Sequence, residues 1–396
     1  MRPLAGVRVV ELAKLIPSAL VGRKLADLGA DVVKVEPPPS GDYLRTIPPM
    51  VDGVSIYHRL LDRNKRSVLL DVDDVSDRDR LLALVAMADV VIDGSRPAAM
   101  AARGIHWTRI AQEHPRLVVC AISGFGTDGP WASLPAHGLS MEALAGCLPL
   151  NWDEEGRPSV SAGWHASWAI ELGACGAALA VTAAVLGARS GGHGAVIDAS
   201  CWDAGIESLR YDLALYEHRG EVMPELREYG PLYRPYRTAD GRALFFAALE
   251  EKFWERFCAA VERPDLVALR GKGAVDFRRN DPLEAALAAI FVTRAATEWQ
   301  DLLQRAGVPA GIVMDVPSLF SSPALGQRGM FEPVEGGLGN VPDAVRWLSP
   351  VPDRMGSRPR AAPEPGQHQD LVFSSWGAES ASSCRGGGGN GERDAT

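Results

Sequence analysis

Short runs of Val, Ile and Leu alternate with longer amphipathic stretches over the first 200 residues. Five apolar runs are predicted to be strands: Val7–Leu12, Ala30–Glu36, Ser67–Val72, Asp89–Ile92 and Arg116–Ile122. Four stretches between them are predicted to be helices: Pro17–Gly29, Ser76–Ala88, Pro97–Ala102 and Trp107–Glu113. Runs that are nearly continuous in branched apolar residues are typical of strands buried on both faces. The alternation therefore predicts an α/β fold with a doubly wound, mostly parallel sheet.

One segment resembles a membrane span. Leu172–Ala188 carries no charge and lies within a longer predicted helix, Ser167–Arg189. A span needs about 20 strongly apolar residues, whereas this segment is rich in Ala and Gly. We therefore expect a buried helix that packs closely on its neighbours, and no membrane association.

The pattern changes near Pro231. The following residues predict a hairpin whose turn is Ala239–Gly241, and helical patterns come after it. We therefore expect a smaller α+β domain, a Pro-rich segment that returns to the first domain, and a low-complexity, disordered tail. The predicted limits are 1–225 for the large domain, 226–325 for the small domain, 326–373 for the return segment and 374–396 for the tail.

Composition excludes several classes of protein. Lys and Arg number 41 against 50 Asp and Glu, a net charge of −9, which argues against binding to a nucleic-acid backbone. The six cysteines show no CxxC spacing, so neither a disulfide scaffold nor a zinc site of paired thiolates is expected. The first residues have no apolar run before a small-residue cleavage site, so we do not expect them to be a signal peptide. We expect a cytoplasmic protein with no metal site.

Common catalytic and nucleotide-binding motifs are absent from the sequence or do not follow the strand that they need. There is no GxxxxGK[ST] phosphate loop, and no GxGxxG follows the first predicted strand. There is also no HExxH and no GxSxG. Nicotinamide, P-loop, zinc-hydrolase and serine-hydrolase chemistry therefore have no motif support. The general alternative is an α/β protein with a ligand at the carboxyl ends of its strands.

Several segments resemble one family, in its order and spacing. They are LAGVRVVEL (4–12), LADLGADVVKVEPP (25–38), RNKRSVLLD (63–71), ISGFGTDGPW (122–131), PYRTADGRALFFAALEEKFW (235–254), GVPAGIVMDV (307–316) and SRPRAAPEPGQHQDLV (357–372). Together they are similar to the family III CoA-transferases, also called the CaiB/BaiF family. This family includes formyl-CoA transferase, carnitine CoA-transferase and α-methylacyl-CoA racemase.

The resemblance implies several properties of the protein. It implies a large CoA-binding domain, a small domain, and two subunits threaded through each other as an interlocked dimer. The expected substrates are coenzyme A or an acyl-CoA and a carboxylic acid, with no permanently bound cofactor. The dimer is expected to be a homodimer, or a heterodimer with a paralogous subunit.

Four basic residues are candidates for binding the phosphates of CoA. Lys65 and Arg66 precede the third predicted strand, and Arg96 follows the fourth. Guanidinium and ammonium groups suit phosphate, and α/β sheets bind ligands at the carboxyl ends of their strands. The family has an arginine at the position of Ala102, so Arg103 is the candidate substitute. For Lys65 and Arg66 the alternative is a solvated basic turn.

The expected nucleophile of the family is missing. The family's transferases attack the thioester with an Asp, forming a mixed anhydride that CoA thiolate reopens. Counting back from Asp198 with the family's spacing places this Asp at Ala169 or Ile170. Glu171 is the nearest carboxylate and the candidate replacement. One residue on a helix is about 100° of rotation, so Glu171 need not point the same way.

A second chemistry also has candidates. Racemases of this family use a His and that same Asp to remove and return an α-proton. Ala136–His137–Gly138 is similar to their Gly-His-Asp segment at its His, which makes His137 a candidate base. Glu250 matches a family Glu that would orient His137. The alternatives are a loop histidine and a carboxylate at a helix start.

Three hypotheses therefore follow. The leading one is CoA transfer between carboxylic acids, and the second is racemase-type proton transfer. The third is a non-catalytic partner subunit, in which a paralogous chain supplies the missing Asp.

Overall fold

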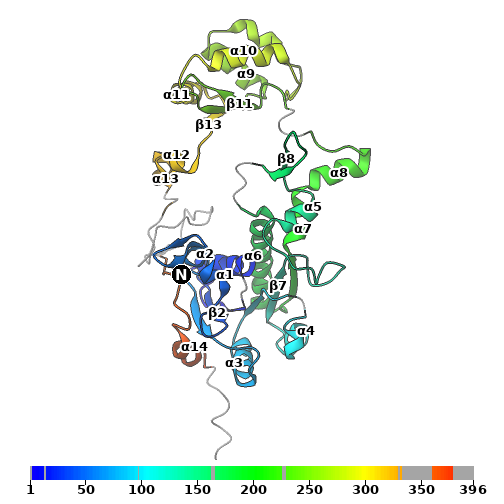
Figure 1. Cartoon of the computed structure of the whole chain (residues 1–396), viewed down its shortest axis with the longest axis vertical. Helices are drawn as coiled ribbons and strands as arrows, with labels where there is room; N and C mark the ends of the chain where they lie inside the picture. Colours follow the sequence, from blue (N-terminus) through cyan, green and yellow to red (C-terminus); the bar gives the residue numbers. More distant parts are fainter. Residues whose placement is uncertain are drawn as a thin grey trace, which may run out of the picture. The chain divides into compact units, whose positions relative to one another are not determined.

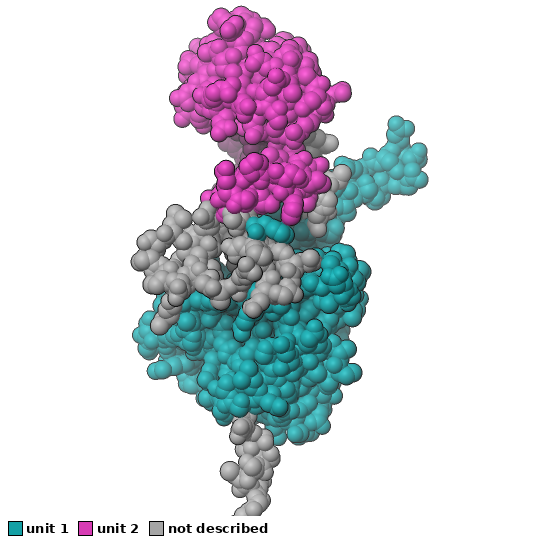
Figure 2. Space-filling view, turned by 90° about the vertical axis from the view of Figure 1, so that its left-hand side faces the viewer, with its two compact units in different colours: residues 1–210, 330–396 teal, residues 211–329 magenta. Residues whose placement is uncertain are grey.

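The computed structural model describes residues 2–12, 15–96, 98–161, 166–224, 229–328, 331 and 359–377. The chain forms two compact units, which Figure 2 colours separately. Unit 1 comprises residues 1–210 and 330–396, and unit 2 comprises residues 211–329. The limits between the units therefore lie near residues 210 and 330, beside the predicted domain limits at 225 and 325.

Unit 1, in which Figure 1 labels strands β2 and β7, is built on a six-stranded sheet in the order β10-β7-β6-β1-β2-β5. All five strand pairs are parallel, as the pattern of apolar runs predicts. The strands are β1 (Arg8–Leu12), β2 (Asp31–Glu36), β5 (Arg66–Leu69), β6 (Val90–Asp93), β7 (Val118–Ser123) and β10 (Val196–Ser200). Their register aligns Leu12 of β1 with Asp93 of β6, and Ser123 of β7 with Ser200 of β10. The carboxyl ends of the central strands therefore meet at one edge.

Helices cover both faces of this sheet. On one face, α1 (Ile16–Asp27) and α6 (Trp168–Arg189) pack on apolar side chains such as Val9 and Val118. On the other face, α3 (Val75–Ala86) and α14 (Gln369–Trp376) pack on the strand side chains that point away from α1 and α6, such as Val10 and Val119. Helix α4 (Trp107–Glu113) packs beside them. Alternating strand residues thus enter two cores, because successive side chains of a strand point to opposite faces. The sheet is doubly wound.

The long apolar helix α6 belongs to the core. Ser167 caps it, since its Oγ accepts a hydrogen bond from Ile170 N at 3.3 Å. By length and composition it is also the one helix of the described residues that could span a membrane. Its small residues, however, pack closely inside unit 1: an added Cβ at Gly173 would lie 3.2 Å from the Cα of Cys201. Such contacts are those of a core helix.

Unit 2 has its own core. Its sheet has the order β11-β12-β13 and is antiparallel, and β11 and β12 form the predicted hairpin. Trp254, Phe257, Phe291 and Trp299 are buried between the sheet and its helices. The elements are β11 (Arg234–Arg237), β12 (Ala243–Phe246), α9 (Glu251–Ala260), η4 (Pro264–Leu269), α10 (Asp281–Phe291), α11 (Ala296–Ala306), β13 (Ala310–Ile312), α12 (Val316–Phe320) and α13 (Pro323–Arg328).

Several further elements have no counterpart in the sequence predictions, or differ from them. The predicted helix Pro97–Ala102, whose first residue lies outside the described residues, is replaced from residue 98 by a turn and a 3₁₀ helix, η2 (Ala101–Arg103), because Ala98 has a φ of 66°, which an α-helix does not accept. The others are η1 (Tyr43–Thr46), β3 (Met50–Val51), β4 (Val54–Ser55), α2 (Ile56–Leu61), α5 (Ser140–Ala145), β8 (Leu150–Trp152), β9 (Pro158–Val160), α7 (Cys201–Ser208) and α8 (Arg210–Arg219).

The C-terminal segment returns to unit 1. Helix α14 reaches Trp376, three residues into the predicted disordered tail 374–396, which corrects the start of that tail. The reason is the Trp376 side chain, which is 2% exposed and donates from Nε1 to Asp31 at 2.9 Å. Arg8 lies over the Trp376 ring, 5.3 Å from its centroid. Residues 378–396 lie outside the described residues.

Candidate functional site

A cavity of about 530 Å³ opens at the carboxyl edge of the unit 1 sheet. Its wall is formed by the segments that follow β1, β6 and β7, together with the loop 132–138, Met141 of α5 and Ile170 in the first turn of α6. This is the edge at which α/β sheets bind ligands, and the volume is typical of small-molecule sites. Most of the lining is apolar.

Two loops shape this cavity, one through an unusual backbone conformation and one through a close approach of its backbone to a neighbour. Leu15, which follows β1, has a φ of 66° and a ψ of −160°, a region that disfavours residues with a side chain. Gly124 follows β7, and a Cβ there would overlap Ala136. The loop after Gly124 is tied down by Asp198 of β10, which accepts bonds from Thr127 N at 2.9 Å and Thr127 Oγ1 at 2.8 Å.

Three of the predicted site residues line the cavity: Arg96, Arg103 and His137. Arg96 is exposed, and its guanidinium has no hydrogen-bond or ion-pair partner among the described residues. Arg103 donates to Asp73 at 2.7 and 3.1 Å and to Ala99 O at 2.9 Å. The cavity therefore presents one guanidinium without a partner, a second held by an exposed carboxylate, and an imidazole.

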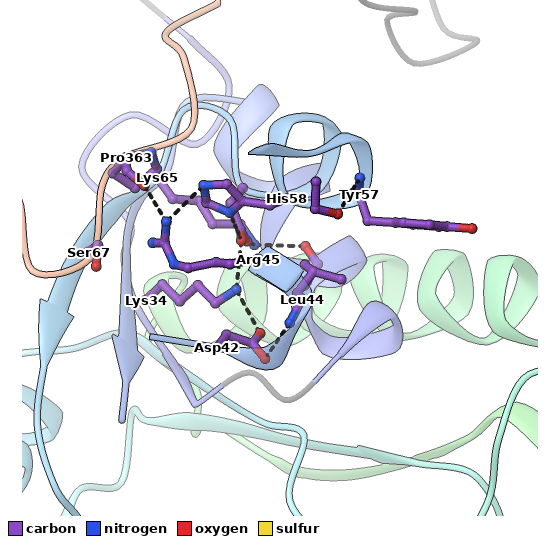
Figure 3. A network of polar contacts seen from close by, with 12 residues as sticks. Lys34, Asp42, Leu44, Arg45, Tyr57, His58, Lys65, Ser67 and Pro363 are labelled. Atoms are coloured by element: carbon purple, nitrogen blue, oxygen red, sulfur yellow. Dashed lines mark hydrogen bonds and ion pairs between the residues drawn. The ribbon is translucent and has the colours of Figure 1, made fainter. Parts of the chain in front are cut away.

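Lys65 lies elsewhere, in a buried cluster of charges (Figure 3). Its ammonium group is 0% exposed and lies 2.8 Å from Glu11 and 2.9 Å from Asp62. It also donates to Ala19 O at 2.9 Å. All three of its donor hydrogens are thereby used. No hydrogen is left for a phosphate, so we do not carry Lys65 into the proposed CoA site.

A second lysine completes the cluster. Lys34 Nζ lies 2.7 Å from Asp62 and 2.9 Å from Asp42, and His58 Nδ1 lies 2.8 Å from Asp62. We call Glu11, Lys34, Asp62 and Lys65 the buried ion cluster. It alternates in sign and joins β1, β2 and the turn that precedes β5.

Beside the buried ion cluster, Glu36 binds Arg45 and Ser67. Arg45 donates to Glu36 at 2.6 and 2.8 Å, and Ser67 Oγ donates to Glu36 at 2.6 Å. Arg45 also donates to Pro363 O at 2.9 Å, which ties the returning C-terminal segment to the same place (Figure 3).

The charges of the cluster shift each other's pKa. Burial alone would raise the pKa of Asp62, but the ammonium groups of Lys34 and Lys65 hold it well below its usual range. Burial likewise opposes ionisation of Glu36, yet hydrogen bonds from Arg45 lower its pKa. For Glu11 burial dominates and raises the pKa to about 7, although Lys65 and Lys34 lower it.

Arg66 also points away from the cavity. Its guanidinium pairs with Asp31 and donates to Ser375 Oγ at 3.1 Å, beside the Trp376 ring. Arg66 thus fastens α14 to the edge of the sheet, and we do not carry it into the proposed CoA site.

The remaining predicted site residues are Glu171 and Glu250. Ala169 and Ile170 are buried on the inner face of α6, whereas Glu171 is half-buried, is rotated away from Ile170 and does not line the cavity. Glu250 belongs to unit 2, where its backbone carbonyl accepts bonds from Phe253 N and Trp254 N at the start of α9. Its pairing with His137 therefore stays a prediction.

Sequence reasoning did not single out Ser95, Ser123 and Tyr43, which also line the cavity. Ser95 could have been found from its place two residues after the strand end at Asp93, which accepts a bond from Ser95 N at 2.8 Å. Within the described residues, no group of His, Cys, Asp or Glu side chains is arranged to hold a metal ion.

Comparison with known proteins identifies the family. The model of CoA-transferase family III matches residues 4–369 of the chain. The chain belongs to this family.

Relatives of this CoA-transferase family III member cover most of its length. It is 29% identical over 336 residues to the acetyl-CoA:oxalate CoA-transferase of Acetobacter aceti, across 83% of this chain and 85% of that protein. It is 29% identical to the succinate–glutarate CoA-transferase of Agrobacterium fabrum, across 94% and 95%. The crystal structure of Rv3272 from Mycobacterium tuberculosis covers 94% of this chain and 99% of its own, at 25% identity and a TM-score of 0.80. The fold is that of the family.

The pKa shifts predict how the stability of unit 1 depends on pH. Asp62 and Glu36 have folded pKa values below their ordinary 3.8 and 4.5, so their contribution is present above these values and is lost as the pH falls through the lowered ones. Glu11 has a folded pKa raised from 4.5 to about 7, so its contribution is present below pH 4.5 and is lost as the pH rises through 7. We expect a stability maximum near pH 4.5, because the Asp62 and Glu36 contributions are lost below it and the Glu11 contribution is lost as the pH rises from it through 7.

Hydrogen exchange of the β1 and β2 amides, measured from pH 3 to 8 with correction for intrinsic rates, reports this profile. Glu36→Gln should reduce the loss of protection as the pH falls below 4.5, whereas Glu113→Gln on exposed α4 should leave that loss unchanged. Protection that stays constant across this range in the wild type would contradict the assigned shifts.

Proposed function

We propose that this protein transfers CoA from an acyl-CoA thioester to a second carboxylic acid. The donor acyl-CoA and the acceptor carboxylate become the donor carboxylate and the acceptor acyl-CoA. The observation that carries the proposal is the cavity, which combines two guanidinium groups with the first turn of α6 at the carboxyl edge of the sheet. Membership of CoA-transferase family III supports the same reaction.

Arg96 and Arg103 are the proposed ligands of the CoA phosphates. Guanidinium groups bind phosphate with two parallel hydrogen bonds, and Arg96 has no competing partner among the described residues. Arg103 would exchange Asp73, which is exposed, for a phosphate oxygen. The apolar lining suits the less polar pantetheine arm.

The relatives suggest substrates to test first. Their names include acetyl-CoA with oxalate, and succinate with glutarate. We propose small carboxylic acids of this kind as acceptors.

Racemase-type proton transfer is the second candidate, because His137 lines the same cavity. A neutral imidazole there would serve as a base toward an α-proton. The third candidate, a partner subunit that a paralogous chain completes, is favoured by the methyl group at Ala169. These three candidates predict different activities for the isolated chain: CoA transfer, α-proton exchange, or no turnover without a paralogous chain.

A dimer is the proposed assembly, and a second copy of this chain is the proposed partner. Leu172, Leu179 and Leu186 repeat every seventh residue along α6 and are 44%, 73% and 68% exposed. Such a stripe of large apolar side chains is typical of a surface that a second subunit covers. A paralogous subunit is the alternative partner. The described cysteines are free thiols, and we propose a cytoplasmic location.

The first prediction concerns CoA binding and turnover. With succinyl-CoA or acetyl-CoA as donor, and oxalate, glutarate or succinate as acceptor, we expect a new acyl-CoA by liquid chromatography. Arg96→Ala should raise KM for the donor at least about 10-fold, since a charge-assisted phosphate contact contributes about 1.5–3 kcal/mol. The control Arg109→Ala, on exposed α4, should leave KM unchanged. No transfer with any pair, together with α-deuterium exchange that His137→Ala abolishes, would favour the racemase instead.

The second prediction concerns assembly. Multi-angle light scattering should give a mass near twice 42.4 kDa at all protein concentrations tested. Leu179→Asp should weaken the dimer, because it would bury a charge in the apolar stripe, whereas Leu371→Asp, an exposed residue of α14 outside the stripe, should not. A monomer mass for the wild type at every concentration would rule out this assembly.

A further inference from the structure

A buried carboxylate lies directly beside the position of the missing family Asp. Glu142 of α5 is 0% exposed. Its Oε1 accepts hydrogen bonds from Ser167 Oγ at 2.5 Å and from Ala169 N at 3.0 Å. Both donors belong to the start of α6, whose aligned peptide dipoles favour negative charge there. The carboxylate is therefore fixed at the residue where the family's nucleophile is expected.

The second carboxylate oxygen of Glu142 accepts no hydrogen bond from the described residues. Oε2 is buried and has no hydrogen-bond partner among the described residues. No Lys, Arg or His of these residues forms an ion pair with Glu142, in contrast to the buried ion cluster. A buried polar atom without a partner is costly, and a catalytic role is one of the few explanations for it.

Small side chains and thiols surround this carboxylate. An added Cβ at Gly205 of α7 would lie 2.9 Å from Ala145 Cβ and 3.6 Å from both Ala169 Cβ and Cys147 Sγ. Burial and then the nearby Glu142 carboxylate raise the pKa of Cys147, and they raise the pKa of Cys201 to about 12. These two thiols thus stay protonated beside Glu142.

Residues adjacent in sequence to Glu142 and to Ala169 line the cavity of the proposed CoA site. Met141, the preceding residue, lines the cavity, and so does Ile170, which follows the Ala169 whose N–H binds Glu142. Attack on a thioester held against this wall requires Oε2 to turn toward the cavity.

We propose that Glu142 is the nucleophile of CoA transfer in this chain, in place of the family's Asp. This inference rests on the proposed function. Oε2 attacks the thioester carbonyl, a C–O bond forms, the C–S bond breaks, and CoA leaves as thiolate. The product is a mixed anhydride between Glu142 and the donor acyl group.

The thiolate then attacks the Glu142 carbonyl carbon, which releases the donor carboxylate and leaves a glutamyl-CoA thioester. The acceptor carboxylate attacks this thioester, CoA thiolate leaves again, and a second mixed anhydride forms. Attack of the thiolate on the acceptor carbonyl gives the new acyl-CoA and restores Glu142. No proton, electron or further reactant is needed.

The two donors at Oε1 have a defined role in these steps. When the Glu142 carbonyl is attacked, the negative charge develops on Oε1. Ser167 Oγ–H and Ala169 N–H already lie at 2.5 and 3.0 Å from that atom. Donors placed in advance where charge develops are a large source of rate enhancement.

Covalent trapping tests this assignment. The wild-type protein is incubated with succinyl-CoA or acetyl-CoA and then with hydroxylamine, which converts a glutamyl anhydride or thioester to a hydroxamate. Tandem mass spectrometry should place the hydroxamate on Glu142. A hydroxamate on Glu171, or on any other carboxylate, would overturn the assignment and leave the proposed function standing.

Substitution provides the second arm of the test. Glu142→Gln keeps a carbonyl oxygen for Ser167 and Ala169, and should lower transfer at least about 100-fold while CoA still raises the melting temperature. Glu207→Gln, at an exposed residue of α7, is the matched control and should transfer at the wild-type rate. Wild-type transfer in Glu142→Gln would overturn the proposal.

A rescue variant separates the inference from the proposed function. Adding Ala169→Asp to Glu142→Gln should restore transfer, because it returns a carboxylate to the same place. Transfer that appears only with Ala169→Asp, and never in the wild type, would overturn the role of Glu142 but keep the reaction. No transfer in the wild type or in Ala169→Asp would overturn both.

Discussion

The fold of unit 1 depends on four charges that are buried together. Glu11, Lys34, Asp62 and Lys65 have side chains with 0% exposure, yet each lies within 2.9 Å of an opposite charge. Removing one partner from such a group costs about 3–5 kcal/mol, because the other charge stays buried alone. The ion pairs of the cluster therefore hold β1, β2 and the turn before β5 in one arrangement. The cluster also requires a glycine at position 22 of α1, because a Cβ there would overlap the Glu11 carboxylate.

This arrangement positions the cavity and the C-terminal segment. Glu11 precedes Leu12, the last residue of β1, and Leu15 and Ile16 just beyond it line the cavity. On the other side, the backbone of Arg360 exchanges hydrogen bonds with Asn64 at 2.8 and 3.1 Å, next to Lys65 in the sequence. A substitution in the cluster would therefore disturb both the proposed CoA site and the return of the chain from unit 2.

The sheet was predictable from the sequence because buried parallel strands need continuous apolar runs. Strand and helix limits followed within a few residues, as for α6, where Ser167 is the cap. The burial of the Lys65 ammonium group was not predictable, because a basic residue before a strand has the same local pattern whether it faces solvent or Glu11. Only the three-dimensional pairing with a residue 54 positions away decides between these. The helix expected at Pro97–Ala102 failed for a similar reason, since its composition is helical but Ala98 adopts a positive φ.

The candidate site was predictable only in part. Arg96, Arg103 and His137 lie at strand ends or in motifs, and the structure brings them to one cavity. Glu142 carries no sequence signal, because it precedes Ala169 by 27 residues and meets it only where α5 packs on α6. Searching for a replacement near Ala169 in sequence leads to Glu171, whereas searching in space leads to Glu142.

The most direct test of this account is a double-mutant cycle on Glu11 and Lys65. The free energy of unfolding of unit 1 is measured by hydrogen exchange for the wild type, Glu11→Leu, Lys65→Met and the variant with both changes. If the buried ion cluster determines the fold, each single change is costly, the double change is much milder than their sum, and the coupling is about 2 kcal/mol or more. Single changes whose effects add within about 0.5 kcal/mol would show that these charges act independently and would contradict the account.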